Sequence, residues 1–342
     1  MDPLSHVLLG AATGQAIGSG RRRIAALAGA AGALLPDADV LIASGTDPLL
    51  ALEYHRQFTH SIVAAPVGAF IVAALLWLLL RRRVEPGRLY WPALAGYLSA
   101  LLLDACTSYG TQLLWPFTDT RFAASIVAVI DPVVTLVLLA GVVLAVRASA
   151  PSSARVAVGL VAIYLGFGWI QRERAQSLVA AAAAQRKHVI TQHEVKPTLG
   201  NVLLWRSVYL HGNDYFIDAA RVGLSPPVLY IGGSVRRVRP IDLVPPLDVN
   251  SVQATDLVRF ARVSEGFLAR HPSMPDVIGD VRYSMLPNSI APLWGIEVHS
   301  EREHEHVGFR TFRAFTKDDR QRFFAMLRGV APEETVVRGR SK

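Results

Sequence analysis

The chain has 342 residues, a formal net charge of +8 and a hydrophobic content of 51%. The apolar residues concentrate in residues 1–170, which are dominated by Ala, Leu, Val, Ile and Gly, whereas residues 171–342 read as soluble. Much of the positive charge is arginine beside apolar stretches, which favours a membrane protein over a nucleic-acid-binding one. The single cysteine, Cys106, excludes an intramolecular disulfide. We also expect no removable signal peptide, because no basic region or cleavage site opens the chain.

Six apolar segments in the first half predict helices. They cover residues 4–19, 24–35, 62–80, 89–103, 123–146 and 156–170. Residues 62–80 carry no charge and form the clearest membrane span, since roughly 20 apolar residues cross a bilayer. The first two segments are marginal by length and could form a packed hairpin. Gly10, Gly14 and Gly18 recur every four residues, a spacing that lets another helix approach closely. The sequence therefore predicts a polytopic helical domain over residues 1–170.

The second half predicts a soluble α+β domain over residues 189–342, reached through a charged, alanine-rich helical linker at 171–188. A hairpin is expected from two apolar runs, 202–210 and 215–217, around the turn His211-Gly212-Asn213-Asp214. Further strands are predicted at residues 228–231 and 293–298, and helices at 252–270 and 317–328.

Arginine clusters indicate how the first half crosses the membrane. They are residues 21–23, residues 81–83 with Arg88, and Arg147 with Arg155. If the first segment begins outside, all three clusters fall in cytoplasmic connections, as the positive-inside tendency requires. This assignment predicts a multi-pass protein of the bacterial inner membrane, with its C-terminal domain outside the cytoplasm.

The same assignment brings histidines and carboxylates to the opposite face, although it makes no use of them. These residues are His6, Asp37, Asp39, His55, His60, Asp104 and Asp131. Ionisable groups beside a membrane span are costly and usually functional. The centre of the set is the stretch Tyr54-His55-Arg56-Gln57-Phe58-Thr59-His60-Ser61.

Imidazole and carboxylate together predict a divalent-metal site, with zinc favoured over manganese or iron. The candidate ligands are His6, Asp37, Asp39, His55, His60 and Asp104. Six ligands exceed the needs of one catalytic zinc, so two metals are an open alternative. Arg56 could bind a phosphate oxygen, and Asp37 or Asp39 could act as general base.

Structural roles remain open for several of these groups. A histidine beside an arginine or threonine at a helix start is often a cap or an interfacial anchor, and Asp37 and Asp39 could form an ordinary turn. Asp131, which precedes Pro132, is favoured as a helix start or a supporting partner. The second histidine-rich stretch, His304-Glu305-His306, is predicted to be a solvated charged face.

At these residues the sequence resembles the YdjM-like family of inner-membrane, metal-dependent hydrolases, described as LexA-regulated. The matching pieces lie within residues 1–150 and are Ser5-His6 with Leu8-Leu9-Gly10, residues 36–39, residues 55–61, residues 104–111 and Ile130-Asp131-Pro132. The most specific is His-Arg-x-x-Thr-His-Ser, and the soluble half resembles the tail of longer members. The family is thought distantly akin to zinc-dependent phospholipase C and P1-type nucleases, which implies a helical zinc site acting on phosphodiesters. One position departs: the family usually has histidine four residues before the aspartate matching Asp104, and here Ala100 stands there.

These observations predict a membrane-bound, metal-dependent hydrolase acting on a phosphoester or lipid substrate. Membrane lipid is the expected partner, and nucleic acid is not expected. Two alternatives stand beside it. One is a non-catalytic metal-binding or envelope assembly protein. The other is a transporter, which is disfavoured because the polar groups gather at one end of the spans and not at the midplane.

Overall fold

The computed structural model describes residues 1–18, 21–80, 84–148, 150–223, 225–243, 247–330 and 336–338. The chain forms two compact units. The first comprises Met1–Leu41, Tyr54–Ile170 and Leu199–Asn201, and the second comprises Ile42–Glu53, Gln171–Thr198 and Val202–Lys342. A short segment of the N-terminal half, Ile42–Glu53, therefore belongs to the second unit. The predicted arginine cluster at residues 81–83 lies outside the described residues.

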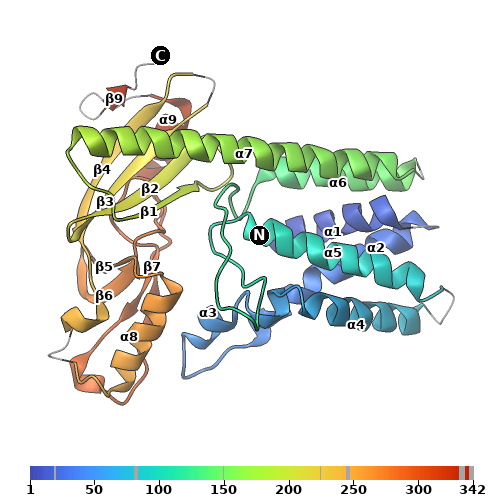
Figure 1. Cartoon of the computed structure of the whole chain (residues 1–342), viewed down its shortest axis with the longest axis horizontal. Helices are drawn as coiled ribbons and strands as arrows, with labels where there is room; N and C mark the ends of the chain where they lie inside the picture. Colours follow the sequence, from blue (N-terminus) through green and yellow to red (C-terminus); the bar gives the residue numbers. More distant parts are fainter. Residues whose placement is uncertain are drawn as a thin grey trace. The chain divides into compact units, whose positions relative to one another are not determined.

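The first unit is helical (Figure 1). Its elements are α1 (Pro3–Ile17), α2 (Arg22–Leu34), η1 (Leu35–Leu41), η2 (Phe58–His60), α4 (Ala64–Leu79), α5 (Gly87–Ala105), α6 (Pro132–Arg147) and the first part of α7 (Ser152–Gln185). The short helix α3 (Leu50–Tyr54) ends where this unit resumes. Apolar side chains of α1, α6 and α7, among them Leu8, Leu138 and Val161, form one buried cluster.

Close contact between glycines brings α1, α2 and α5 together. A Cβ atom added at Gly29 would overlap the carbonyl oxygen of Gly10, and one at Gly96 would overlap that of Gly29. Gly14 likewise faces the backbone of Ala25. The predicted close approach at Gly10 and Gly14 is thus confirmed, and it involves backbone against backbone, as small residues allow.

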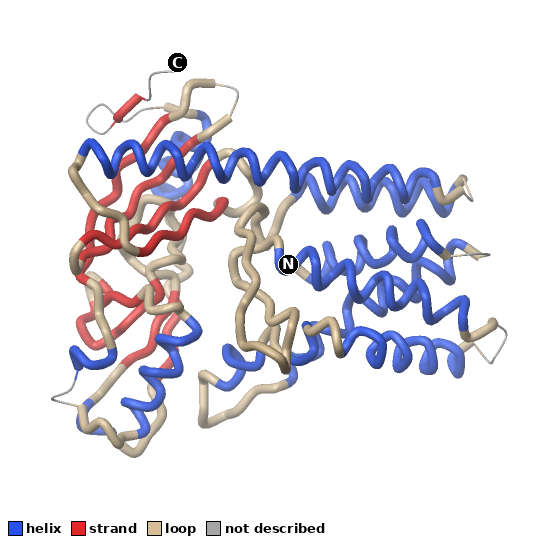
Figure 2. The backbone as a smooth tube through the Cα atoms, viewed as in Figure 1, coloured by secondary structure: helices blue, strands red, loops and turns tan. Residues whose placement is uncertain are grey.

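The predicted helix over residues 123–146 is wrong at its start. The structure begins α6 at Pro132, and residues 123–131 belong to an irregular stretch between α5 and α6 (Figure 2). Proline favours the first helical position and disfavours helix in the residue before it. The carboxylate of Asp131 caps the helix by accepting from the backbone N–H of Val133 at 2.9 Å.

Fewer helices than expected are long and apolar enough to cross a membrane. Among the described residues they are Arg22–Leu41 and Ser152–Gln185, with a third if Leu50–His60 and Ala64–Leu79, bent by 82°, count as one span. The predicted clearest span shortens to the 16 residues of α4, because Ser61 and Ile62 lie in the turn after η2. At 1.5 Å per residue, α4 alone measures about 24 Å, less than the roughly 30 Å hydrocarbon core.

The helix α7 joins two elements that the sequence separates. The predicted span at 156–170 and the predicted linker helix at 171–188 form one 34-residue helix, drawn as an uninterrupted ribbon in Figure 1. Neither proline nor glycine occurs between Trp169 and Gln185, so nothing in the chain breaks the helix there.

The second unit holds two antiparallel sheets, so the prediction of a mixed α+β region after a helical half is confirmed. One sheet has the order β1-β2-β3-β4-β9 and the other β5-β6-β7-β8. The strands are β1 (Gln192–Pro197), β2 (Leu204–His211), β3 (Asp214–Arg221), β4 (Val228–Arg236), β5 (Leu268–His271), β6 (Met274–Asp280), β7 (Trp294–Glu297), β8 (Gly308–Thr311) and β9 (Val336–Arg338). The helices are α8 (Val252–Val263) and α9 (Lys317–Arg328).

Two sequence predictions for this unit have different outcomes. The hairpin is confirmed, with His211 paired to Asp214 across the turn. The helix predicted over residues 252–270 ends instead at Val263. Glu265 and Gly266 have positive φ angles of 50° and 75°, so the chain reverses there and continues as β5. Glycine adopts such a conformation readily.

We expect Gly29→Ala to destabilise the first unit by about 1–3 kcal/mol, because its new methyl group meets backbone that side-chain rotation cannot clear. Gly159→Ala in α7 is the matched control, since a Cβ atom there meets nothing within 4 Å. Thermal unfolding in detergent should show a lower midpoint for Gly29→Ala and an unchanged or higher one for Gly159→Ala. Equal midpoints would contradict the glycine-mediated packing.

Candidate metal centre

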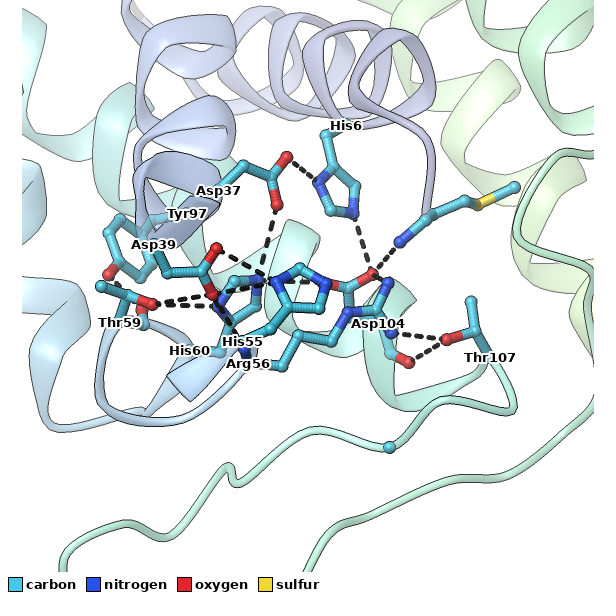
Figure 3. Close-up of polar contacts among 12 residues, drawn as sticks. His6, Asp37, Asp39, His55, Arg56, Thr59, His60, Tyr97, Asp104 and Thr107 are labelled. Carbon is cyan, nitrogen blue, oxygen red and sulfur yellow. Dashed lines mark hydrogen bonds and ion pairs between the residues drawn. The ribbon is translucent and has the colours of Figure 1, made fainter. Parts of the chain in front are cut away.

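The predicted ligands meet where several segments of the first unit converge (Figure 3). His6 lies in the second turn of α1, Asp37 and Asp39 in η1, His60 in η2, and Asp104 in the last turn of α5. His55 follows α3 directly. The structure thus brings all six residues into one network of contacts, and their role as metal ligands stays a prediction.

Four of these residues form the inner cluster: His6, Asp37, His60 and Asp104. His6 Nδ1 lies 3.0 Å from Asp37 Oδ2, and His6 Nε2 lies 3.1 Å from Asp104 Oδ1. His60 Nε2 lies 3.2 Å from Asp104 Oδ2 and 3.6 Å from Asp37 Oδ1. The side chains of His6, His60 and Asp104 are wholly buried, while that of Asp37 is 16% exposed. Solvent therefore reaches the inner cluster only on the Asp37 side.

Asp39 and His55 form a pair beside the inner cluster. His55 Nδ1 lies 3.1 Å from Asp39 Oδ1, and His60 Nδ1 lies 3.3 Å from Asp39 Oδ2. Asp39 Oδ2 also accepts the backbone N–H of Arg56 at 2.8 Å. A carboxylate on Nδ1 fixes that nitrogen as the donor and leaves Nε2 as the nitrogen that can bind a metal or a proton. Asp39 therefore orients two imidazoles at once. The His55 side chain is 31% exposed and is the most accessible of these groups.

The hydrogen bonding and the atom spacing within the inner cluster both fit a divalent metal. Its buried atoms His60 Nε2 and Asp104 Oδ2 lie 3.2 Å apart as an ion pair, but neither makes a hydrogen bond of normal geometry. Buried polar atoms normally make one, so this pair is suited to hold a cation. Donor atoms on a tetrahedral metal with bonds of about 2.0–2.1 Å are themselves about 3.3 Å apart, close to the spacings seen here. Ligand atoms of His6, Asp37 and Asp104 also lie within 4.8 Å of one another.

Arg56 is held inside the site and does not extend into solvent. Its Nη2 lies 2.8 Å from Asp104 Oδ1, and its Nη1 donates to Thr107 Oγ1 at 2.8 Å. The backbone of Arg56 has a positive φ of 60°, an uncommon conformation for a residue with a side chain. The predicted phosphate-binding arginine is therefore already paired with Asp104 in this structure.

Asp131 has the structural role that the sequence favours. It is buried, it caps α6, and its Oδ2 accepts from the Tyr164 hydroxyl at 2.9 Å. Within the described part of the chain, its carboxylate bonds to Val133, Val134 and Tyr164 and not to the inner cluster.

Sequence reasoning missed several supporting residues. Thr107 donates to the Asp104 carbonyl at 2.7 Å as well as accepting from Arg56. The Tyr97 hydroxyl donates to the carbonyl of Thr59, and the Met1 amine contacts Asp104. Tyr97 stands seven residues before Asp104 on α5, a spacing that puts both on one helix face and could have identified it. Thr107 lies inside the matching piece at 104–111, which gave no reason to single it out.

A second group of potential ligands lies in the second unit and comprises Asp47, Asp256 and His306. The guanidinium of Arg259 is 2.8 Å from Asp47 and 2.7 Å from Asp256, so a cation already balances these carboxylates. His306 Nδ1 lies 2.8 Å from Asp256 Oδ2. His304 is exposed, as the predicted solvated face requires. These contacts make the group an ion-pair network centred on Arg259.

Comparison with known proteins gives results for the half that carries the site. The YdjM inner membrane protein family matches residues 1–175. The uncharacterized protein YfhP of Bacillus subtilis is 29% identical over 150 residues, which are 42% of this chain and 45% of YfhP. The inner membrane protein YbcI of Escherichia coli is 39% identical over 96 residues, which are 27% of this chain and 53% of YbcI.

The chain thus spans about half the length of the curated relatives that it matches. No solved structure matches it significantly. The family match covers more than half of the chain and includes every residue of the inner cluster together with Asp39, His55 and Arg56. This chain therefore belongs to the YdjM inner membrane protein family.

Proposed function

We propose that this protein is a membrane-bound, metal-dependent hydrolase of phosphoesters, including lipid phosphoesters. The carrying observation is the buried pair His60 Nε2 and Asp104 Oδ2, which make no hydrogen bond of normal geometry and lie among four converging candidate ligands. In this proposal His6, Asp37, His60 and Asp104 hold the metal, and zinc suits their mixed imidazole and carboxylate chemistry best. When bound, such a metal polarises a phosphoryl oxygen and stabilises the charge that develops on it.

The remaining residues of the site have separate roles in this proposal. Asp39 accepts from the Arg56 backbone and faces both His55 and His60, so it orients imidazoles more readily than it takes up a proton. Asp37 keeps an exposed edge, and His55 is the most exposed imidazole, so these two are the groups that can exchange protons with a substrate. Arg56 holds Asp104 in place through its 2.8 Å contact.

A second candidate is a metal-binding membrane protein without catalysis. Two observations favour it. Ala100 stands where the family usually has histidine, and Arg56 forms an ion pair with one carboxylate oxygen of Asp104. Turnover distinguishes the two readings. Purified protein that holds zinc and hydrolyses a generic phosphodiester is the enzyme, whereas tightly held zinc without turnover supports the binding protein.

The metal assignment predicts that His60→Ala weakens zinc binding at least tenfold, or about 1.4 kcal/mol, because it removes a buried donor. Metal content measured by elemental analysis and zinc affinity measured by competition with a chelator test this. His304→Ala is the matched control, since His304 is exposed and lies in the second unit. Loss of zinc in the His304 variant with retention in the His60 variant would move the site to the other unit.

A substitution at Ala100 is expected to strengthen zinc binding. This residue is buried on α5 one helical turn before Asp104, so a histidine there would lie on the same face. We expect Ala100→His to raise zinc affinity or stoichiometry despite an overpacking cost of about 1–3 kcal/mol. Ala100→Leu controls for the added volume without a ligand atom. Equal metal content in all three proteins, with Asp104→Ala also without effect, would remove Asp104 from the proposed ligand set.

The proposed orientation places the second unit outside the cytoplasm, because Arg21, Arg88, Arg147 and Arg155 then flank cytoplasmic connections. Fusions at Lys342 to a phosphatase that is active only outside the cytoplasm, and to a fluorescent protein that matures only inside, test it. The phosphatase fusion should be active and the fluorescent one dark. The reverse pattern would put both the second unit and the metal centre on the cytoplasmic side.

A further inference from the structure

The segment between Asp39 and His55 is anchored in the second unit. Residues Ile42–Glu53 belong to that unit, whereas the residues on both sides belong to the first. Leu49 is only 1% exposed and lies in an apolar cluster with Leu257 and Phe260 of α8. Leu52 packs against the same cluster. Burying a leucine side chain contributes about 1.5–3 kcal/mol in general, so this contact is a substantial anchor.

Arg259 of α8 provides a second anchor through charge. Its Nε and Nη2 lie 2.9 and 2.7 Å from the two carboxylate oxygens of Glu53, a bidentate arrangement. Nη2 also donates to Asp47 Oδ2 at 2.8 Å, and Nη1 donates to Asp256 Oδ1 at 2.7 Å. One guanidinium therefore joins the middle of the segment, at Asp47, and its end, at Glu53, to α8. We call Asp47, Glu53, Asp256 and Arg259 the clasp.

The clasp is preorganised on the α8 side. Asp256 is buried, and its Oδ2 accepts the backbone N–H of Val307 at 3.1 Å and lies 2.8 Å from His306 Nδ1. Its other oxygen, Oδ1, accepts from Nη1 of Arg259, so Asp256 orients this guanidinium independently of Glu53. Hydrogen bonding to Glu53 raises the pKa of Arg259 above its usual value, which outweighs burial, so the cation is permanent. Burial acts to raise the pKa of Asp47, but the hydrogen bond from Arg259 outweighs it and the net pKa is lowered.

The clasp is linked to the metal centre by a short piece of chain. Only two residue steps separate Glu53 from His55, a span of at most about 7 Å. Eight steps separate Asp39 from Asp47, enough for roughly 26 Å and hence considerable slack. The clasp therefore restrains the His55 side of the site much more than the Asp39 side. The next residue, Arg56, has the positive φ and pairs with Asp104.

We propose that Arg259 is a positioning residue for the metal centre. By holding Glu53 it fixes the short connection that presents His55 to Asp39 and Arg56 to Asp104. The second unit thereby sets the metal affinity of a site to which it contributes no ligand. This inference rests on the proposed function, because it concerns the same metal.

The test uses full-length protein in detergent and measures affinity for zinc alone in wild type, Arg259→Gln and Glu53→Gln. We expect both variants to bind zinc about tenfold more weakly, the lower end of the effect of groups that orient ligands. Arg239→Gln is the matched control. Arg239 also donates Nε and Nη2 to a carboxylate, that of Asp242, in the same unit, and this ion pair includes no residue of the segment. It should bind zinc like the wild type.

Two further measurements separate positioning from loss of folding. Arg259→Lys keeps the charge but not the fork, so its affinity should fall between wild type and Arg259→Gln. The visible absorption spectrum of bound Co²⁺ reports the ligand geometry, and it should change in Arg259→Gln while circular dichroism at the assay temperature matches the wild type. Unchanged affinity and spectrum in both Arg259 variants would overturn the inference, and so would an equal loss in Arg239→Gln. A wild-type protein that binds no zinc would overturn the proposed function and this inference with it.

Discussion

The burial of Asp104 is the constraint on which the first unit depends. An ionised carboxylate without solvent is costly unless charged and hydrogen-bonding partners surround it. Those partners come from separate places: His6 from α1, His60 from η2, and Arg56 from the connection after α3. Of these, His6 is brought to Asp104 by the packing of α1 and α5 on α2, backbone to backbone at their glycines. The helices that pack closely at their glycines therefore also carry residues of the polar site.

Local patterns in the sequence predicted much of the architecture. The β2–β3 hairpin and α9 were recognisable because alternation and helical spacing are encoded within each stretch. The gathering of histidines and aspartates followed from arginine positions alone. The predicted boundaries were wrong where a proline or a turn interrupts an apolar stretch. The three places are the start of α6 at Pro132, the Ser61–Ile62 turn before α4, and the chain reversal at Glu265 and Gly266. Apolar residues occur on both sides of these boundaries, so hydrophobicity alone does not locate them.

Other features had no local signal at all. Leu49 is one of three leucines in the short run Leu49-Leu50-Ala51-Leu52, and its burial against α8 depends on residues about two hundred positions later. The pairing of Glu53 with Arg259 is equally remote, and neither residue belongs to a recognisable motif. The division within the site is also geometric. Spacing could group six candidate ligands, but only the folded structure separates the buried inner cluster from the partly exposed His55 with its partner Asp39.

The family match ends at residue 175, after Asp104, the last candidate ligand, but well before α8. A chain cut there would retain every donor atom and lose the cover over Leu49, together with the only guanidinium described beside both Asp47 and Glu53. Its stretch from Ile42 to Glu53 would then present the Leu49 side chain to water and lose the Arg259 guanidinium that contacts Asp47 and Glu53. YbcI, whose matched residues are 27% of this chain and 53% of its own length, is about half as long. In members of that size, the stretch between the aspartate and histidine pieces should be shorter or carry different charges, which would make its length a marker of whether a C-terminal unit follows.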